Sequence, residues 1–296
     1  MAGWHIVTSE YPPQPGGVSD YTRLVAEGLA RRGEEVHVWC PRRAGVDEGG
    51  VEGDAGAPGV SVHRACGSFS PADLRRLGRS LGEYRAPRRL LVQYVPHGYG
   101  YRSMNAALCL WLWKRAALDG DEVEIVAHEP FLAFGEGSRR QDAVALVHRL
   151  MTALLLRAAG RVWATIPAWA EAWRPYALGR RVRFEVLPVP STIPVLGDPA
   201  RTSAARSLYA RPGGVLVGHL GTYSPLITRD LRRVLPPLLA RHESASALLL
   251  GRGGEEERDE IVRRHPSLGG RVHAAGYLPA RELSAHLSAC DLMLQP

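Results

Sequence analysis

The sequence predicts an α/β protein of two domains, each built on a doubly wound parallel sheet. Three observations lead to this fold class. Short apolar segments alternate with amphipathic segments along the chain, as they do in strand–helix–strand units. The alternation stops once, in a proline-rich stretch at residues 188–214, and then starts again. The length of 296 residues is enough for two domains that each bury a core.

The first domain is expected to cover residues 1–190. A short apolar strand at residues 6–9 leads through a loop rich in proline and glycine into a helix that ends near Gly33, and a strand follows at residues 36–40. This order forms a βαβ unit with a right-handed crossover. Glycine and acidic residues make residues 45–59 a surface loop. Further strands are expected at residues 60–64, 90–94, 123–128, 161–166 and 184–187, and helices at 71–81, 106–117, 141–159 and directly after Pro167.

A linker with one helix is expected at residues 191–214, where periodicity is weak. The second domain is expected at residues 215–296 and repeats the alternation of strand and helix. Pro296 follows the start of an apolar segment typical of a buried strand, and a sheet edge left open there would be uncovered. We therefore expect an incomplete second domain and a truncated or fragmentary chain. The linker helix is expected at residues 201–209; the strands of the second domain are expected at residues 215–220, 245–250, 272–274 and 292–294, and its helices at 229–241, 255–265 and 279–289.

The net charge of +7 comes almost entirely from arginine, because Lys114 is the only lysine. GC-rich coding produces such a bias as readily as an anionic partner does, and we expect no nucleic-acid partner. Paired arginines in the first half are typical of solvated helix ends. The alternative is a peripheral contact with the anionic inner face of a membrane. The pairs are Arg31-Arg32, Arg42-Arg43, Arg75-Arg76 and Arg88-Arg89.

Cysteine usage and the absence of targeting signals predict a cytoplasmic protein without a structural metal. The four cysteines are scattered, with no C-x-x-C pair and no histidine spacing of the zinc type. Met1 leads directly into an apolar strand rather than into a basic region followed by an apolar stretch. No segment reaches the roughly 20 apolar residues of a membrane helix.

The loop after the first predicted strand carries the glycine pair Gly16 and Gly17. Ligands of open α/β sheets bind outside the carboxyl ends of the strands, which is where this loop lies. A bare backbone and the free N–H groups of the following helix suit a phosphate or a sugar hydroxyl. The alternative is an ordinary βα loop. The pattern G-x-G-x-x-G is absent, which argues against a dinucleotide cofactor.

Two further loops of the first half carry polar and aromatic side chains. His128 and Glu129 come at the end of an apolar strand, and a histidine there can donate to a sugar hydroxyl or take up a proton near neutral pH. An aromatic loop contains Tyr94, His97 and Tyr99, whose rings and hydroxyls suit a sugar surface. The alternatives are a loop histidine bonded to the backbone and an exposed turn.

Two glycine loops follow strands of the second half. Each stands between a strand and a helix, so that backbone N–H groups at the helix N-terminus can hold a diphosphate, with Arg229 or Arg232 to neutralise it. A tight turn and a surface arginine are the alternatives. The candidate donor-binding residues are Gly221, Thr222, Tyr223, Arg229, Gly251 and Gly253.

Taken in this order, the segments resemble bacterial glycosyltransferases of the retaining GT-B group, family 4. The resemblance spans the whole chain, and it rests on the order and spacing of its motifs. It implies two Rossmann-like domains that face a cleft, the first binding the acceptor and the second the nucleotide sugar. The residues that carry it are Ser9–Pro13, Gly16–Val18, Leu29–Gly33, His128–Pro130, Gly218–Tyr223 and Ala289–Pro296.

The resemblance also implies the reaction. A sugar would pass from a UDP- or GDP-linked donor to a glycan, lipid-linked or small-molecule acceptor, with retention of configuration and without a metal. It places Gly16 and Gly17 near the reaction centre and His128 on the donor sugar or in the catalytic site. With the reading of the loops themselves, we predict His128 and Glu129 as catalytic residues and Gly16, Gly17, Tyr94, His97 and Tyr99 as acceptor-binding residues. Backbone N–H groups and cationic side chains would meet the charge of the leaving diphosphate in an oxocarbenium-like step.

The chain departs from the family pattern in two places. Members place an arginine and a lysine on the diphosphate, where this chain has Thr222 and roughly Thr228, with Arg229 as the nearest cation. The acidic E-x7-E motif, which contacts the donor sugar and ribose, would follow Pro296. We therefore expect little or no turnover from this chain.

Two other functions stay open. A non-catalytic GT-B module would bind a glycan or a partner protein, and Thr222 together with the missing carboxylate pair favours it. A nucleotide-sugar epimerase of the same architecture needs extra carboxylates in the cleft, for which Glu129 and Glu136 are the nearby candidates.

Overall fold

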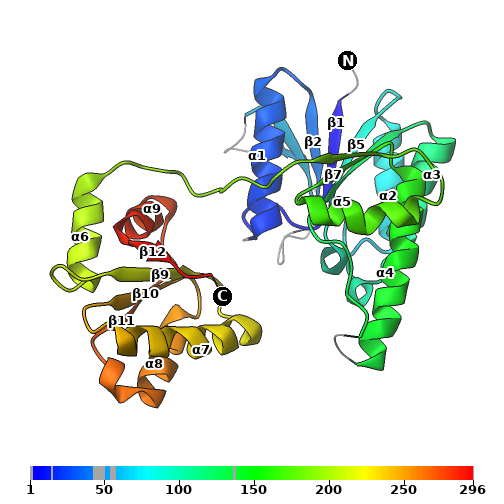
Figure 1. The fold of residues 1–296 in the computed structure, drawn as a ribbon. Coiled ribbons are helices and arrows are strands. Elements are labelled where there is room, and N and C mark those ends of the chain that lie inside the picture. The colour runs from blue at the N-terminus through cyan, green and yellow to red at the C-terminus, as the bar shows by residue number, and fades with distance from the viewer. Residues whose placement is uncertain (1–2, 15, 43–50, 54–57, 136–137, 296) are drawn as a thin grey trace. The chain divides into compact units, whose positions relative to one another are not determined.

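The computed structural model describes residues 3–14, 16–42, 51–53, 58–135 and 138–295 (Figure 1). The chain forms two compact units, Met1–Pro190 and Ser191–Pro296. Residues 191–214, expected as a linker with one helix, belong to the second of these units.

The first unit is built on an eight-stranded sheet with the order β3-β4-β2-β1-β5-β6-β7-β8. All neighbouring strands are parallel except the edge strand β3, which runs antiparallel to β4. The chain fills the sheet outward from β1 on one side and outward from β5 on the other, so the strand order reverses between these two strands. Such a switch point opens a crevice outside the carboxyl ends of its strands. The strands are β1 (Trp4–Thr8), β2 (Val36–Trp39), β3 (Val51–Gly53), β4 (Val60–His63), β5 (Arg89–Tyr94), β6 (Glu122–Ala127), β7 (Arg161–Ala164) and β8 (Arg183–Val186).

Helices cover both faces of this sheet because its central strands are apolar on both sides. Ile6 belongs to the core cluster beneath α1, and the next residue, Val7, belongs to the cluster beneath α2, α3 and α4. Ser70 and Ser138 form capping boxes at the starts of α2 and α4. The helices are α1 (Gly17–Arg31), α2 (Pro71–Gly82), α3 (Ala106–Leu118), α4 (Arg139–Ala158) and α5 (Pro167–Trp173), with 3-10 turns at Pro96–Tyr99, Tyr101–Ser103 and Arg174–Ala177.

The second unit has a four-stranded parallel sheet with the order β11-β10-β9-β12. Arg206 on α6 donates to the backbone oxygens of Ala289 and Gly214, at 2.9 Å each, and so fixes α6 against α9. The strands are β9 (Leu216–Leu220), β10 (Ser246–Leu250), β11 (Val272–Gly276) and β12 (Leu292–Met293). The helices are α6 (Pro199–Tyr209), α7 (Pro225–Arg241), α8 (Gly254–Arg264) and α9 (Ala280–Ala289), with a 3-10 turn at Pro266–Leu268.

The structure differs from the sequence-based elements in three places. Strand β3 lies inside the stretch expected as the loop 45–59, of which residues 45–50 and 54–57 lie outside the described residues. Helix α7 begins at Pro225 rather than near Arg229, because proline suits the first helical position. The 3-10 turns after β5 replace an irregular loop.

Candidate functional site

Three loops at the carboxyl edge of the first sheet meet at its switch point. The loops after β1 and β5 are in contact, because a Cβ atom on Gly98 would lie 2.3 Å from the Ser9 hydroxyl oxygen. The loops after β5 and β6 are joined by a polar contact of 3.2 Å between His97 Nδ1 and Glu129 Oε2. The sequence placed His97 and Glu129 on separate loops, and the structure brings them together.

The first glycine loop already holds an anion from the chain itself. Glu10 Oε1 accepts a hydrogen bond from the backbone N–H of Ser19, in the first turn of α1, at 2.9 Å. The carboxylate fills the space beside Gly16, where a Cβ atom would lie 2.3 Å from Oε1. Gly17, in contrast, has open space around its Cα. The N-terminus of α1 was expected to be free for a ligand, and Glu10 takes up one of its N–H groups and much of its positive potential.

His128 lies half-buried at the end of β6. Its Nε2 is 2.8 Å from Oε1 of Gln93, a fully buried side chain on β5. An amide oxygen can only accept, so Nε2 carries the proton and Nδ1 is left as an acceptor. The ring of Tyr21 on α1 meets the imidazole edge-on at 5.2 Å between centroids. Burial lowers the pKa of His128 to about 4, so the ring is neutral at neutral pH.

A cavity of about 550 Å³ lies between the loops after β5 and β6, and His128 itself is not among its lining residues. Its apolar wall includes Phe131, Leu132 and Trp169, and His97 and Glu129 are among its polar lining residues. Trp169 Nε1 donates to the His128 backbone oxygen at 3.0 Å, which fixes the cavity wall to the end of β6. An apolar wall with a few polar groups is typical of a small-molecule site.

Tyr94 and Tyr99, expected on the acceptor, are core residues instead. Each side chain is 1% exposed. The Tyr99 hydroxyl donates to the Gln93 backbone oxygen at 2.6 Å, and its ring stacks on Tyr94. Strand β5 is central in the sheet, and its side chains are covered by helices, so a tyrosine there meets the core rather than a ligand. Only the third tyrosine of the segment, Tyr101, is half-exposed.

The two glycine loops of the second unit lie in contact with each other. The backbone N–H of Gly221 donates to Leu250 O at 3.1 Å. Gly251 has a φ of +106°, and a Cβ atom on it would lie 2.1 Å from the Gly221 oxygen, so only glycine fits this position. Tyr223 covers Gly253, and its hydroxyl donates to Leu250 O at 3.1 Å. The sequence-predicted glycines and Tyr223, with Thr222 between them, therefore form one packed loop pair at the carboxyl edge.

The two candidate phosphate-binding arginines have different surroundings. Arg229 points into solvent, with a side chain 70% exposed, and its Nε lies 3.1 Å from Asp230 Oδ1. That hydrogen bond raises the pKa of the Arg229 guanidinium. Arg232 instead donates through Nε to Glu257 Oε1 at 2.7 Å and so joins α7 to α8. Arg232 is thus a packing residue, and Arg229 is the more available cation.

Three further residues at this edge were given no role in the sequence analysis: His219 and Arg252, which lie inside the glycine-loop segments, and Tyr277. His219 is 2% exposed; its Nδ1 donates to Leu294 O at 2.8 Å, and its Nε2 has no partner within the described ranges. A Cβ atom on Gly221 would lie 2.8 Å from that Nε2. Arg252 lies over the ring of Tyr277, an exposed cation–π pair from the loops after β10 and β11. The sequence signal for His219 was its place in the segment Gly218–Tyr223, where a strand ends in a glycine loop.

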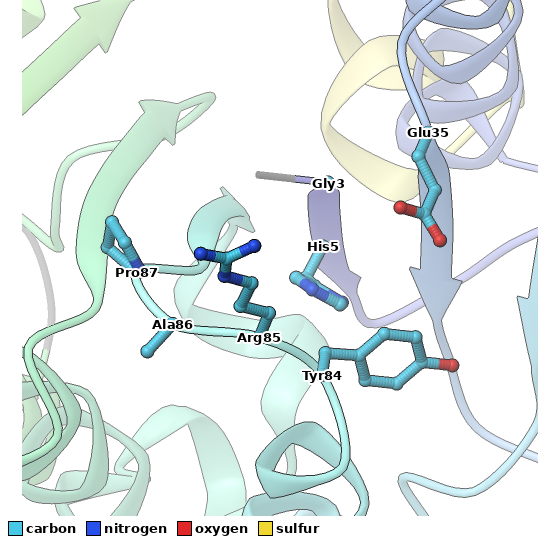
Figure 2. Close-up of a pocket in the computed structure, with 7 residues that line it drawn as sticks. All are labelled: Gly3, His5, Glu35, Tyr84, Arg85, Ala86 and Pro87. Atoms are coloured by element: carbon cyan, nitrogen blue, oxygen red, sulfur yellow. The ribbon is translucent and has the colours of Figure 1, made fainter. Parts of the chain in front are cut away.

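A second cavity, of about 310 Å³, lies at the opposite edge of the first sheet. Figure 2 shows the Tyr84 ring beneath Glu35 and the buried His5 between them and Arg85. Trp39 Nε1 donates to His5 Nδ1 at 3.2 Å, and burial is the main cause that lowers the pKa of His5 to about 3. This is the amino edge of the strands, away from the crevice of a doubly wound sheet.

Neither a metal centre nor a membrane span is found in the described part of the chain. No three histidine, cysteine, aspartate or glutamate side chains among those described are grouped closely enough to hold a metal ion. The described helices are also too short or too polar to cross a bilayer.

Comparisons with known proteins show the fold. No protein-family model and no curated protein matches the sequence. Among solved structures, sucrose-phosphate synthase from Thermosynechococcus elongatus is 17% identical, with a TM-score of 0.73 over 99% of this chain and 75% of that one. The catalytic domain of starch synthase IV from Arabidopsis thaliana, bound to ADP and acarbose, is 13% identical (TM-score 0.62; 99% and 77%).

A further similar structure, S. aureus MnaA with UDP, is 7% identical, with a TM-score of 0.57 over 98% of this chain and 73% of that one. These identities are low, so the similarity speaks for architecture and not for a particular reaction. The chain has an α/β fold with two parallel sheets that match GT-B structures.

Proposed function

We propose that the chain is a nucleotide-sugar-dependent glycosyltransferase of the retaining type. The observation that carries the proposal is the contact between the loops at Gly221 and Gly251, which places a packed glycine surface at the carboxyl edge of a sheet with GT-B architecture. ADP and UDP are bound in two of the similar structures, which supports a nucleotide as the ligand class. The second unit would hold the donor, and the first unit would hold the acceptor.

The diphosphate is best placed at the N-terminus of α7. Its N-cap residue Ser224 makes no side-chain capping bond, and its first turn contains no acidic residue. Free N–H groups and the helix dipole there favour an anion. Helix α8 is a poorer site, because Glu255, Glu256 and Glu257 occupy its first turn. Thr222 and Tyr223 precede α7 directly and would lie against the phosphates.

Side chains around this terminus would complete the donor site. Arg229 lies on the second turn of α7 and would turn from Asp230 to the diphosphate, replacing the arginine–lysine pair of the resembled family. The exposed Arg252–Tyr277 pair offers an aromatic face to a nucleobase. The donor is expected to be UDP- or GDP-linked, and no metal is assigned to its binding.

In the first unit, the acceptor would bind at the carboxyl edge of the sheet, between His128 at the end of β6 and the cavity that His97 and Glu129 line. The Nδ1 atom of His128 is an acceptor, so it would receive a hydrogen bond from a sugar hydroxyl rather than donate one. Glu129 and His97 line the cavity and would contact the acceptor there.

A nucleotide titration tests the donor site. UDP, GDP and ADP, each with and without an attached sugar, are titrated into the chain, and the unfolding temperature and the heat of binding are measured. At least one nucleotide is expected to stabilise the protein by mass action. Arg229→Gln should weaken that effect, whereas the matched variant Arg233→Gln, on the same helix and also exposed, should leave it unchanged. A chain that no nucleotide stabilises contradicts the proposal.

A non-catalytic glycan-binding module is the second candidate. The hydrogen bond from Arg232 to Glu257 favours this second function, because it removes one of the two candidate cations for the diphosphate. This function predicts stabilisation by glycans and none by nucleotides. An epimerase would instead convert a free nucleotide sugar without any acceptor, which NMR of the incubated donor detects. Its second candidate carboxylate, Glu136, lies outside the described residues.

A further inference from the structure

Helices α3 and α4 pack side by side on one face of the first sheet (Figure 1). Their buried side chains, such as Leu112 and Leu155, belong to the core cluster beneath them. Residues on the opposite sides of the two helices therefore share one outward surface. Four large apolar side chains lie there half-exposed: Leu110 (49%), Trp113 (43%), Leu146 (54%) and Leu150 (59%). We call this the α3–α4 outer surface.

The composition of α3 is unusual for a helix at the surface of a globular unit. Of its thirteen residues only Lys114 and Arg115 are charged, and Arg115 is buried. A helix that is apolar all round is normally enclosed by protein or lipid. One exposed leucine needs no explanation, but four large apolar side chains on two adjoining helices form a patch of the kind that binds a partner.

The loop after β6 extends the patch at one end of α4. Arg149 lies over the rings of Phe131 and Phe134, at 4.4 and 3.8 Å from their centroids, and donates to Leu132 O at 2.9 Å. These contacts hold the loop against α4 while Leu132 and Phe134 stay 43% and 50% exposed. Since Leu132 also lines the cavity between the loops after β5 and β6, the patch borders that cavity.

The charge around the apolar side chains is positive. Four exposed cations lie on the two helices: Lys114, Arg139, Arg140 and Arg157. Among the described residues of these two helices, Asp142 is the only acidic one. Its carboxylate accepts a hydrogen bond from the Gly135 N–H at 2.8 Å. Exposed leucines and Trp113 beside cationic side chains suit an anionic lipid surface. The apolar side chains would enter the region between the headgroups and the acyl chains, and the cations would bind the headgroups.

We propose that the α3–α4 outer surface docks peripherally on an anionic lipid bilayer. A second copy of the chain fits this surface less well, because two such faces would bring arginine against arginine. The surface differs from the arginine pairs considered in the sequence, of which Arg88 is buried against Asp121. The proposal rests on this surface alone and holds whether or not the chain transfers a sugar.

Vesicle co-sedimentation of the full chain tests the proposal. Vesicles of phosphatidylcholine mixed with phosphatidylglycerol are expected to bind the protein, with binding weakened by added salt, and vesicles of phosphatidylcholine alone are expected to bind far less. The double variant Leu146→Ser/Leu150→Ser should lower the partition coefficient at least about tenfold. The matched double variant Leu208→Ser/Leu226→Ser, which alters two exposed leucines on α6 and α7, should bind like the wild type. Equal loss in both double variants, or no binding to anionic vesicles, overturns the proposal.

Two measurements separate lipid binding from other occupants. Brominated lipids should quench tryptophan emission of the wild type, and Trp113→Phe should remove much of that quenching; an unchanged quench overturns the assignment of this surface. Sedimentation velocity without lipid tests self-association. A dimer that disappears in Leu146→Ser/Leu150→Ser, without vesicle binding by the wild type, assigns the surface to a second copy instead. Circular dichroism of each variant confirms that it is folded.

Discussion

Gln93 fixes which ring nitrogen of the neutral His128 carries the proton. The fully buried amide on β5 presents its oxygen to His128 Nε2 at 2.8 Å, so the proton stays on Nε2 and the Nδ1 lone pair is left for another partner. The Gln93 Nε2 atom itself has no hydrogen-bond partner in the described segments. Burying an amide N–H group without a hydrogen-bond partner destabilises the fold. Because Gln93 is present despite this cost, we infer that it serves to position the His128 ring.

Replacing Gln93 with methionine tests this role. The variant loses the bond to His128 and also removes the unpaired amide, and because these effects oppose each other, the unfolding free energy should change by less than about 1 kcal/mol. If the chain transfers sugar, the turnover number should fall at least about tenfold with little change in donor affinity. Urea unfolding and steady-state kinetics measure the two quantities. A destabilisation of several kcal/mol would show that Gln93 is a packing residue only.

Stability should fall as the solution is acidified. Burial lowers the pKa of His128 and His63 to about 4 and that of His5 to about 3, below the value of about 6.5 in the unfolded chain. The unfolded state therefore binds protons first, and stability present above about pH 6.5 is lost progressively as the pH falls towards the folded values. Urea unfolding across this window should show the slope. His128→Gln, which cannot titrate, should flatten it, and an unchanged slope would contradict the shift at His128.

The contact between the glycine loops predicts a position-specific cost at Gly251. Gly251→Ala combines a positive φ with a Cβ atom 2.1 Å from the Gly221 oxygen, whereas Gly270→Ala has a positive φ and open space. Strain alone should cost the Gly270 variant about 1 kcal/mol. The clash should add about 1–3 kcal/mol at Gly251 and weaken nucleotide binding, because the loops must separate. Thermal unfolding of both variants checks the difference. Equal losses would mean that the two loops move apart without cost.

The two arginines of α7 should differ in their contribution to stability. Arg232→Gln leaves Glu257, which is 3% exposed, without its cation, so we expect a destabilisation of about 1–3 kcal/mol. Arg229→Gln removes an exposed pair with Asp230 and should change the unfolding free energy by less than about 0.5 kcal/mol. Chemical denaturation of the two variants makes the comparison. A large loss at Arg229 would contradict its description as an exposed cation whose pair with Asp230 adds little stability.

Most of the fold follows from local pattern. Apolar segments such as that at Leu90–Tyr94 and amphipathic segments such as that at Pro71–Gly82 appear in the structure within a residue or two of the expected bounds. Strand β3 was missed because three residues between glycine-rich segments give no periodicity. Its pairing with β4 is a tertiary contact that local sequence does not encode.

The site was less predictable, because side-chain direction depends on what covers each strand. His97 and Glu129 became partners only when β5 and β6 were paired. Tyr94 and Tyr99 turned inward because helices cover the central strand, although the same tyrosines read as a polar loop in sequence. Arg232 was taken by Glu257 from the next helix, a partner 25 residues away along the chain.

The sequence by itself determined the alternation of strands and helices, the glycine positions and the prevalence of arginine, since these are properties of single residues and of short-range spacing. The tertiary structure decided which polar groups are already engaged. Glu10 accepts a hydrogen bond at the N-terminus of α1, and Gln93 accepts one from His128. The large apolar side chains of the α3–α4 outer surface are exposed. The physical reason is that hydrogen bonds and burial join segments far apart in the chain, and their energies exist only once those segments are packed.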